Sequence, residues 1–238
     1  MTTSADGRFD ALKQEMLEDL ALKGRSFGAG LGRDHFCPAV LAAIASVPRH
    51  QHVPNALTGL AYADTPLPIG FGLTATEPLI VALMTDALDV QADHRVLEVG
   101  SGLGYQSAVL ACLGADVFSV EIVPTLAREA HARGRARGLH NVTFGIGDGR
   151  RGWPLFAPYD RIVVTAAAEL IPRTLLHQLA PGGRMVLPAG LPDAQALWVV
   201  DKDRRGHLSS RQIVRGRFAP LTDDEDAGTP QCVEAITE

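Results

Sequence analysis

The sequence predicts an α/β fold in which helices cover both faces of a doubly wound, mostly parallel sheet. From Arg95 onward, short apolar runs alternate with helical stretches, as parallel strands joined by crossover helices require. Two last runs follow each other without a helix, which predicts an antiparallel hairpin at the C-terminal edge. The first five runs lie at 95–100, 116–121, 142–146, 160–165 and 184–188, the helices at about 104–113, 125–138 and 172–180, and the hairpin runs at 196–200 and 212–218, with a turn around 201–206.

Helices are also expected at the N-terminus. Apolar residues recur between charges over residues 10–23, which predicts an amphipathic helix ending near Gly24. Three glycines within 28–32 predict a loop, and residues 38–46 read as a second short helix with Pro38 in its first turn.

A long irregular segment is expected next. Between Val47 and Pro78, five prolines and three glycines interrupt every periodic pattern. Loops of this length are usually functional or disordered. Apolar residues such as Tyr62, Ile69 and Phe71 argue against disorder.

Composition limits the partners. The 22 Lys and Arg against 27 Asp and Glu give a net charge of −5, without the positive excess that binding to a phosphate backbone needs. Charges interrupt the first thirty residues, and no stretch approaches the roughly 18 apolar residues of a membrane span. We therefore expect a cytoplasmic protein that binds neither nucleic acid nor membrane.

No metal site is expected. Cys37, Cys112 and Cys232 are odd in number and widely scattered, which argues against a disulfide framework or a CxxC metal site. His50 and His52 lack an evident third ligand nearby and are better explained as loop histidines.

A glycine loop follows the first strand of the predicted sheet and opens a helix, where backbone amides can approach a ligand closely. It reads Glu98-Val-Gly100-Ser-Gly102-Leu-Gly104. A tight turn or a GxGxxG dinucleotide site are the alternatives. The third glycine comes one residue too early for that motif, and an acid precedes the first. Both features favour S-adenosylmethionine, whose ammonium and sulfonium groups need negative charge nearby.

Two more acids end the next strands. Glu121 could accept hydrogen bonds from ribose hydroxyls and Asp148 from the adenine amino group, although a surface acid and an ordinary Asp-Gly turn are the alternatives. Three acids at successive strand ends, on the edge where open α/β sheets bind ligands, predict a cofactor site. The expected fold is thus the Rossmann-like class I S-adenosylmethionine-dependent methyltransferase type. The expected cofactor-binding residues are Glu98, Gly100, Ser101, Gly102, Gly104, Tyr105, Glu121, Ile122, Asp148, Gly149 and Thr165.

Several motifs together resemble the protein-L-isoaspartate (D-aspartate) O-methyltransferase family. The similarity covers roughly residues 34–222 and keeps the order of the family's motifs. These lie at 47–50, 64–70, 96–110, 147–149, 152–154, 157–160, 164–168, 178–183 and 218–221. The resemblance implies methyl transfer from S-adenosyl-L-methionine, leaving S-adenosyl-L-homocysteine, to the free α-carboxylate of L-isoaspartyl residues in damaged proteins or peptides, which starts their repair through a succinimide. We expect a monomer.

The resemblance also implies substrate-side residues. Thr76 stands at the family's active-site serine and is expected to orient the substrate carboxylate. Substrate contacts are expected from Asp64, Pro66, Leu67, Ile69, Thr74, Phe218, Ala219, Pro220 and Leu221, unless the apolar residues among 66–69 only pack.

This chain departs from the family between Gly72 and Pro78, where the family usually reads Gly-Gln-Thr-Ile-Ser-Gln-Pro. Leu73, Thr76 and Glu77 differ, and Glu77 adds a carboxylate near a site that must receive one. Two alternatives therefore stay open: a dedicated methyltransferase for an ordinary aspartate in one specific peptide, and a catalytically impaired cofactor-binding homologue.

The expected organisation is one compact catalytic unit. Residues 1–78 would supply N-terminal helices and the substrate-side loop, and residues 79–221 the catalytic domain that binds S-adenosylmethionine. Residues 222–238 read as an acidic, mobile tail.

Overall fold

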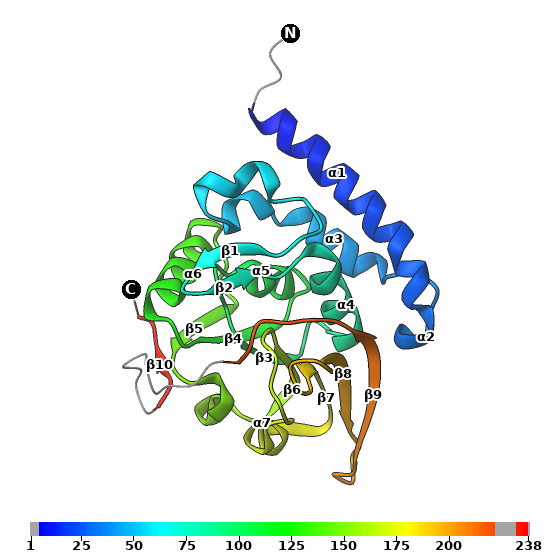
Figure 1. Ribbon diagram of the computed structural model, residues 1–238. Helices are drawn as coiled ribbons and strands as arrows, with labels where there is room; N and C mark the ends of the chain where they lie inside the picture. The colour runs from blue at the N-terminus through cyan, green and yellow to red at the C-terminus, as the bar shows by residue number, and fades with distance from the viewer. Residues whose placement is uncertain (1–4, 222–231, 238) are drawn as a thin grey trace.

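An eight-stranded sheet in the order β10-β5-β4-β3-β6-β7-β8-β9 forms the centre of the molecule (Figure 1). The computed structural model describes residues 5–221 and 232–237. The strands from β5 to β7 in this order run parallel, whereas β8 and β9 add antiparallel to one edge, so the predicted fold class is confirmed. The bounds are β3 Arg95–Val99, β4 Asp116–Glu121, β5 Val142–Ile146, β6 Tyr159–Val164, β7 Leu179–Ala189, β8 Ala196–Lys202 and β9 Leu208–Arg215.

The predicted crossover helices are present as α5 (Tyr105–Cys112), α6 (Pro124–Ala136) and α7 (Arg173–Gln178). A further helix, α4 (Pro78–Leu88), was not predicted. It is buried all round except at Leu79, and it therefore lacks the polar face that gives a helix its sequence period.

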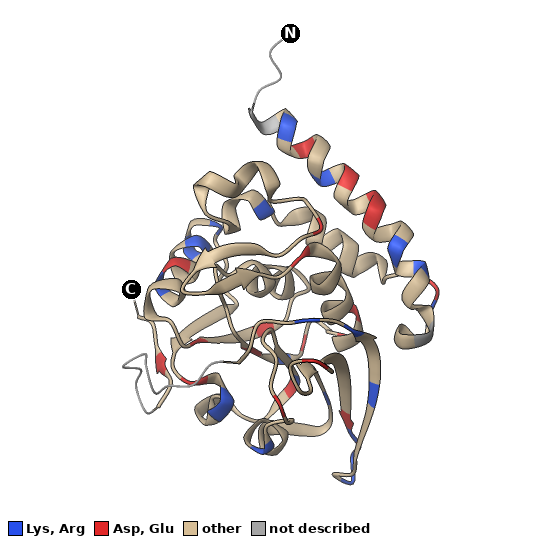
Figure 2. Cartoon of the chain, in the orientation of Figure 1, with Lys and Arg blue, Asp and Glu red and all other residues tan. Residues whose placement is uncertain are grey.

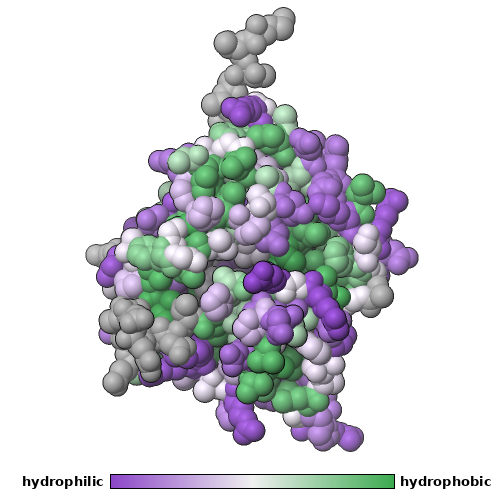
Figure 3. Space-filling view, in the orientation of Figure 1, coloured by the Kyte–Doolittle hydropathy of each residue, from purple (hydrophilic) through white to green (hydrophobic). Residues whose placement is uncertain are grey.

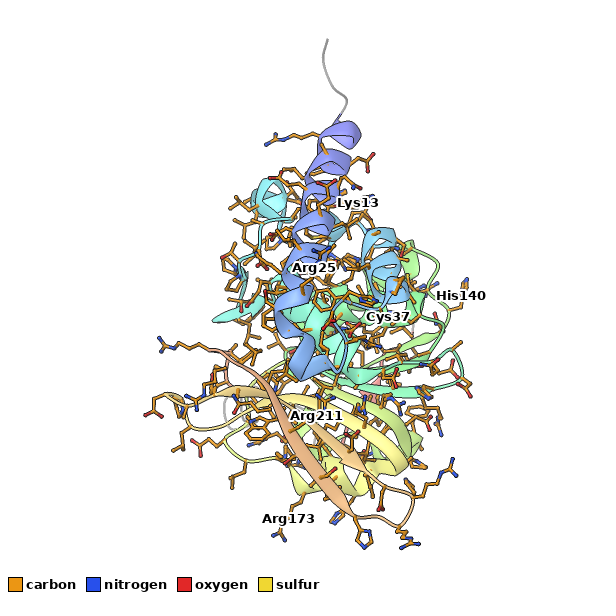
Figure 4. The ribbon with its side chains drawn as sticks, turned by 90° about the vertical axis from the view of Figure 1, so that its right-hand side faces the viewer. Lys13, Arg25, Cys37, His140, Arg173 and Arg211 are labelled. Carbon is orange, nitrogen blue, oxygen red and sulfur yellow. The ribbon has the colours of Figure 1, made fainter. Side chains whose placement is uncertain are left out.

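The antiparallel edge confirms the expected hairpin and corrects its second strand. β9 occupies Leu208–Arg215 instead of 212–218, so Phe218 lies beyond its end. The guanidinium of Arg211 donates to the carbonyl of Gly30 and ties this edge to the N-terminal helices, which lie above β9 in Figure 4.

At the N-terminus, α1 (Ala5–Gly24) and α3 (Pro38–Ser46) form as predicted. Charges of both signs follow one another along α1 (Figure 2). The loop predicted over 28–32 is wrong, because the 3-10 helix η1 (Arg25–Phe27) and the helical turn α2 (Gly28–Leu31) continue the helix. Gly30 allows α2 to lie close to β9, since a Cβ at this position would be only 3.0 Å from Ile213.

The irregular segment is ordered, as expected, and contains structure that the prolines conceal. Two 3-10 helices, η2 (Arg49–His52) and η3 (Asn55–Leu60), precede a hairpin of β1 (Leu67–Gly70) and β2 (Leu73–Ala75). Its tight connection needs left-handed backbone, with φ angles of 92°, 56° and 72° at Gly70, Phe71 and Gly72. The glycines on either side of Phe71 supply the conformation that such turns require.

The end of the predicted tail differs from the expectation. β10 (Glu234–Ala235) pairs antiparallel with β5, which was not predicted. Residues 222–231 lie outside the described residues.

One cluster of buried apolar side chains joins the N-terminal helices to the sheet. Met16 of α1, Leu83 of α4 and Val186 of β7 belong to it. At the surface, Figure 3 shows apolar side chains at several separate places on the face it displays. Among the described residues, no helix combines the length and hydropathy that crossing a bilayer requires.

Candidate functional site

A cavity opens where the parallel strands end. Counting the solvent at its mouth, it encloses about 590 Å³ of empty space. Its wall combines the loops after four strands, because the carboxyl ends of parallel strands meet at one edge. Six predicted cofactor residues lie there: Gly100, Gly102, Glu121, Ile122, Gly149 and Thr165.

The glycine loop after β3 has a shape that side chains would prevent. Gly100, Gly102 and Gly104 have φ angles of 94°, 53° and 81°, in the left-handed region. A Cβ on Gly100 would overlap Oγ1 of Thr165, which donates to the Val99 carbonyl (3.1 Å) and the Gly100 carbonyl (2.9 Å). Backbone thus forms part of the cavity wall directly. Gly104 does not line the cavity, and instead precedes the first residue of α5.

Glu121 is held by backbone donors. Its Oε2 accepts from the Gly102 amide (2.8 Å) and its Oε1 from the Val123 amide (3.0 Å). Burial raises its pKa. Each carboxylate oxygen has a further lone pair, so this acid can receive two hydroxyl donors from the cavity.

Glu98 does not reach the cavity, contrary to the prediction. It is fully buried and accepts from the hydroxyls of Ser107 and Ser119, the latter at 2.6 Å. Burial raises its pKa to about 7. Ser119 also forms a hydrogen bond with Ser101 of the glycine loop (2.5 Å). The hydrogen bonds therefore connect Glu98 to the loop through Ser119 and Ser101, without a direct contact.

Asp148 is at the predicted strand end but is already engaged. Its carboxylate accepts from the backbone amide of Arg150 (2.9 Å) and from its guanidinium (2.9 and 3.1 Å). It lines a neighbouring hollow, whereas Gly149 lines the cavity itself. A direct contact between Asp148 and an adenine amino group would require Arg150 to share this carboxylate.

Two further hollows adjoin the cavity, because Thr74 and Thr165 line all three. The inner hollow contains the predicted residues Ser101, Tyr105 and Thr76, together with two residues not assigned to the site from the sequence, Arg49 and His52. The outer hollow is lined by Pro66, Gly72, Thr74, Thr76, Glu77, Thr165, Arg217, Phe218, Ala219 and Pro220.

The segment that closes the cavity comes from the far end of the chain. The Ala167 amide donates to the Ala219 carbonyl (2.7 Å), and the Leu221 amide to the Ala167 carbonyl (2.8 Å). This pairing places residues 219–221 opposite the β1–β2 hairpin, where Ile69 also lines the cavity.

Two residues predicted to contact the substrate, Asp64 and Leu67, line neither the cavity nor its two adjoining hollows and form contacts within the chain. The carboxylate of Asp64 accepts from the Leu79 amide (3.1 Å) at the start of α4 and pairs with Lys23 of α1 (2.8 Å). Leu67 is buried in the main core. Packing is therefore the right reading for Leu67, while Pro66 and Ile69 line the hollows.

Nothing in the described part of the chain gathers three His, Cys, Asp or Glu side chains into a group that could hold a metal ion. All three cysteines are free. The arrangement provides a backbone-lined cavity with one buried acid, which adjoins the inner and outer hollows.

A mostly parallel sheet with a glycine loop after its first parallel strand and an acid at the end of the next is shared by dinucleotide-binding folds and the class I S-adenosylmethionine-dependent methyltransferases, and the comparisons place this chain in the second class. The family model for protein-L-isoaspartate(D-aspartate) O-methyltransferase matches residues 33–226, and the chain belongs to this family.

Curated relatives match nearly the whole chain. Protein-L-isoaspartate O-methyltransferase 1 of Polaromonas sp. is 46% identical over 223 residues, covering 94% of each chain. Protein-L-isoaspartate O-methyltransferase 2 of Syntrophobacter fumaroxidans is 45% identical, covering 92% of this chain and 89% of the relative.

Solved structures agree on the fold. A protein-L-isoaspartate O-methyltransferase superposes with a TM-score of 0.75 at 26% identity, covering 89% of this chain and 66% of that longer one. A Plasmodium falciparum protein in complex with S-adenosyl-L-homocysteine gives a TM-score of 0.74 at 21% identity, covering 87% of this chain and 97% of that one, and shows the fold alone.

Proposed function

We propose that this chain transfers a methyl group from S-adenosylmethionine to the free α-carboxylate of L-isoaspartyl residues in damaged proteins or peptides. The observation that carries the proposal is the wall shared by the cavity and the outer hollow. Thr74 lines both, and Thr76 lines the inner and outer hollows. A carboxylate entering from outside would therefore meet the ligand of the cavity at the β1–β2 hairpin.

The residues of the cavity suit an adenosyl ligand. Glu121 would hold the ribose hydroxyls, and the left-handed glycines admit a ligand against bare backbone where a Cβ would intrude. When bound, S-adenosylmethionine supplies a methyl group on a positively charged sulfur.

The chemistry needs orientation more than proton transfer. An ordinary carboxyl group has a pKa near 4 and is already a nucleophile at neutral pH, so no general base is required. Holding the attacking oxygen in line and excluding water can contribute ~7–11 kcal/mol in favourable cases. We assign the hydroxyl of Thr76 to orienting this carboxylate. The backbone amide nitrogen of the following residue then attacks the ester carbonyl and displaces methanol, which closes a succinimide without further help from the protein.

The departures from the family at Leu73, Thr76 and Glu77 motivate a second candidate function, because Thr76 and Glu77 line the outer hollow. The candidate is a dedicated enzyme that methylates an ordinary aspartate in one specific peptide. A non-catalytic cofactor-binding homologue is the third reading.

The test uses methyl-labelled S-adenosylmethionine with a matched pair of isoaspartyl and aspartyl peptides, and counts base-labile methyl ester on each. Selective labelling of the isoaspartyl peptide is expected. Labelling of the aspartyl peptide alone would establish the dedicated enzyme, and binding of S-adenosyl-L-homocysteine without labelling of either peptide would establish the non-catalytic homologue.

We also propose that the protein acts as a cytoplasmic monomer and binds no nucleic acid. The net charge of −5 supports the last of these, because it lacks the positive excess that binding to a phosphate backbone needs. Light scattering of the purified chain and retention on heparin resin would test the oligomeric state and the binding of polyanions.

A further inference from the structure

Arg49 places a buried positive charge beside the candidate active site. The residue starts η2 and is only 1% exposed. Its Nε donates to the Ala61 carbonyl (2.8 Å) and its Nη2 to the Thr76 carbonyl (2.6 Å). The guanidinium carbon lies 4.6 Å from the centre of the Tyr105 ring.

This cation lacks a counter-ion. No Asp or Glu carboxylate among residues 5–221 and 232–237 lies within ion-pair distance of it. Two carbonyls and the Tyr105 ring contact the guanidinium, but burying a charge that has no ion-pair partner is still costly. Arginine does not escape the cost by losing its proton, even though burial lowers the pKa of Arg49. An anion that comes from outside the chain would balance the charge.

Another polar atom in the same hollow has no partner. Nε2 of His52 is buried and forms no hydrogen bond within the described residues. Nδ1 of His52 faces the Leu103 carbonyl (3.0 Å), which can only accept. The proton of the neutral ring is therefore on Nδ1, and Nε2 presents a lone pair. Burial lowers the His52 pKa to about 4, so the ring stays neutral at pH 7.

We infer that the inner hollow, formed by η2, β2 and the start of α5, is a carboxylate-binding subsite whose cation is Arg49. This inference rests on the proposed function, which brings two carboxylates to this place: the amino-acid end of S-adenosylmethionine and the reacting group of the substrate. An acceptor on His52 beside the cation matches the adjacent ammonium and carboxylate of an α-amino acid. The geometry thus favours the cofactor's carboxylate.

Arg49 also links the two halves of the reaction. The same guanidinium that would bind the carboxylate holds the backbone of Thr76, whose hydroxyl we assign to the substrate. A ligand at Arg49 and the orientation of Thr76 would then depend on one side chain.

The experiment compares wild type, Arg49→Gln and Arg49→Lys with Arg161→Gln as the matched control. Arg161 is half-buried and also donates to two carbonyls, those of Asp89 and Asp160, but lines none of the three hollows of the site. Titration calorimetry measures affinity for S-adenosyl-L-homocysteine and for 5′-methylthioadenosine, which lacks the amino-acid end. Steady-state methyl transfer gives KM for the isoaspartyl peptide.

Losing a charged hydrogen bond should weaken binding by about ten- to a hundredfold. We expect this loss for S-adenosyl-L-homocysteine in Arg49→Gln, with unchanged affinity for 5′-methylthioadenosine and no change in Arg161→Gln. A peptide KM raised by the same factor, with unchanged S-adenosyl-L-homocysteine affinity, would assign the subsite to the substrate carboxylate. Unchanged affinity and KM, or equal losses for both adenosyl ligands, would overturn the inference and leave Arg49 a structural role.

Melting midpoints show whether each variant folds. If Arg49→Gln does not, the wild type is titrated with decarboxylated S-adenosyl-L-homocysteine, 5′-deoxy-5′-(3-aminopropylthio)adenosine, which lacks only the carboxylate, and Arg49→Lys is assayed for KM. Equal wild-type affinity for both ligands would overturn the assignment to the cofactor's carboxylate, and a peptide KM raised in Arg49→Lys would then assign the subsite to the substrate carboxylate. A wild type that binds no S-adenosyl-L-homocysteine would instead overturn the proposed function.

Discussion

The side chain of Glu121 and the backbone of Gly102 hold each other in place across the sheet edge. Oε2 of Glu121 accepts from the Gly102 amide at 2.8 Å, in a loop where Gly102 has a φ of 53°. The carboxylate that would bind ribose and the glycine loop beside it therefore depend on each other, and replacing Glu121 should also alter the conformation of the loop at Gly102.

Replacing Glu121 should weaken cofactor binding, less in Glu121→Gln than in Glu121→Ala. Glu121→Gln keeps one acceptor oxygen, so S-adenosyl-L-homocysteine affinity should fall about tenfold. Glu121→Ala also leaves the Gly102 and Val123 amides without acceptors, so both affinity and the melting midpoint should fall further. Calorimetry and thermal unfolding measure the two effects. Asp116→Asn, at the exposed start of the same strand, is the control, and unchanged affinity in Glu121→Ala would contradict the assigned role.

Removing the hydroxyl of Thr76 should slow methyl transfer and spare cofactor binding. Thr76→Val keeps the shape of the side chain but cannot donate to a carboxylate, which costs about 1.5–3 kcal/mol, or ten- to a hundredfold in kcat/KM. Thr76→Ser restores the family's residue and should be at least as active as the wild type, because its rotamer is less restricted. Labelled methyl transfer to the isoaspartyl peptide provides the rates.

Thr58→Val controls for the loss of a threonine hydroxyl elsewhere, since Thr58 donates only to the Asn55 carbonyl in η3. If Thr76→Val transferred methyl groups at the wild-type rate, the hydroxyl would have no part in the reaction.

Neutralising Glu77 should improve the binding of an isoaspartyl peptide. Its half-buried carboxylate lines the outer hollow, and repulsion there contributes about 1 kcal/mol or less, so Glu77→Gln should lower KM by up to about fivefold. Because salt screens exposed charges, the difference in KM between Glu77→Gln and wild type should shrink at about 1 M salt. Asp193→Asn, on the loop between β7 and β8, should leave KM unchanged. A KM that rises in Glu77→Gln would show that this carboxylate attracts its substrate instead, as the dedicated-peptide reading allows.

The sequence predicts best where one local rule decides the structure. The alternation of apolar runs and helical stretches identifies the parallel sheet, and the glycines at 100, 102 and 104 identify a loop that needs left-handed backbone. Both features depend on residues close together in the chain.

The residues that sequence reasoning misplaces depend on partners far along the chain. Asp64 reads as a substrate contact until Lys23 and the start of α4 meet it, and Glu98 reads as a ligand until Ser107 and Ser119 enclose it. Arg49 carries no signal beyond its place in the family's Val-Pro-Arg-His segment, because burial of an arginine is a property of the tertiary structure.

Glu98 should make the protein less stable as the pH rises. Its native pKa of about 7 exceeds the ordinary value of 4.5, so between these pH values the unfolded chain loses a proton that the native state keeps. The free energy of unfolding then falls by about 1.4 kcal/mol per pH unit, or about 3 kcal/mol in all once the pH exceeds 7. Glu98→Gln cannot ionise and keeps an acceptor for the serines, so its stability relative to wild type should rise by this amount from pH 4.5 to pH 8.

Urea unfolding of wild type and Glu98→Gln at pH 4.5, 6 and 8 measures this gain. His52, whose lowered pKa acts in the opposite direction, destabilises both proteins equally as the pH falls and cancels in the comparison. Glu129→Gln, which alters an exposed carboxylate paired with Arg133, controls for the loss of a carboxylate at the surface. A stability difference between Glu98→Gln and wild type that does not change with pH would mean that burial among the serines does not keep Glu98 protonated.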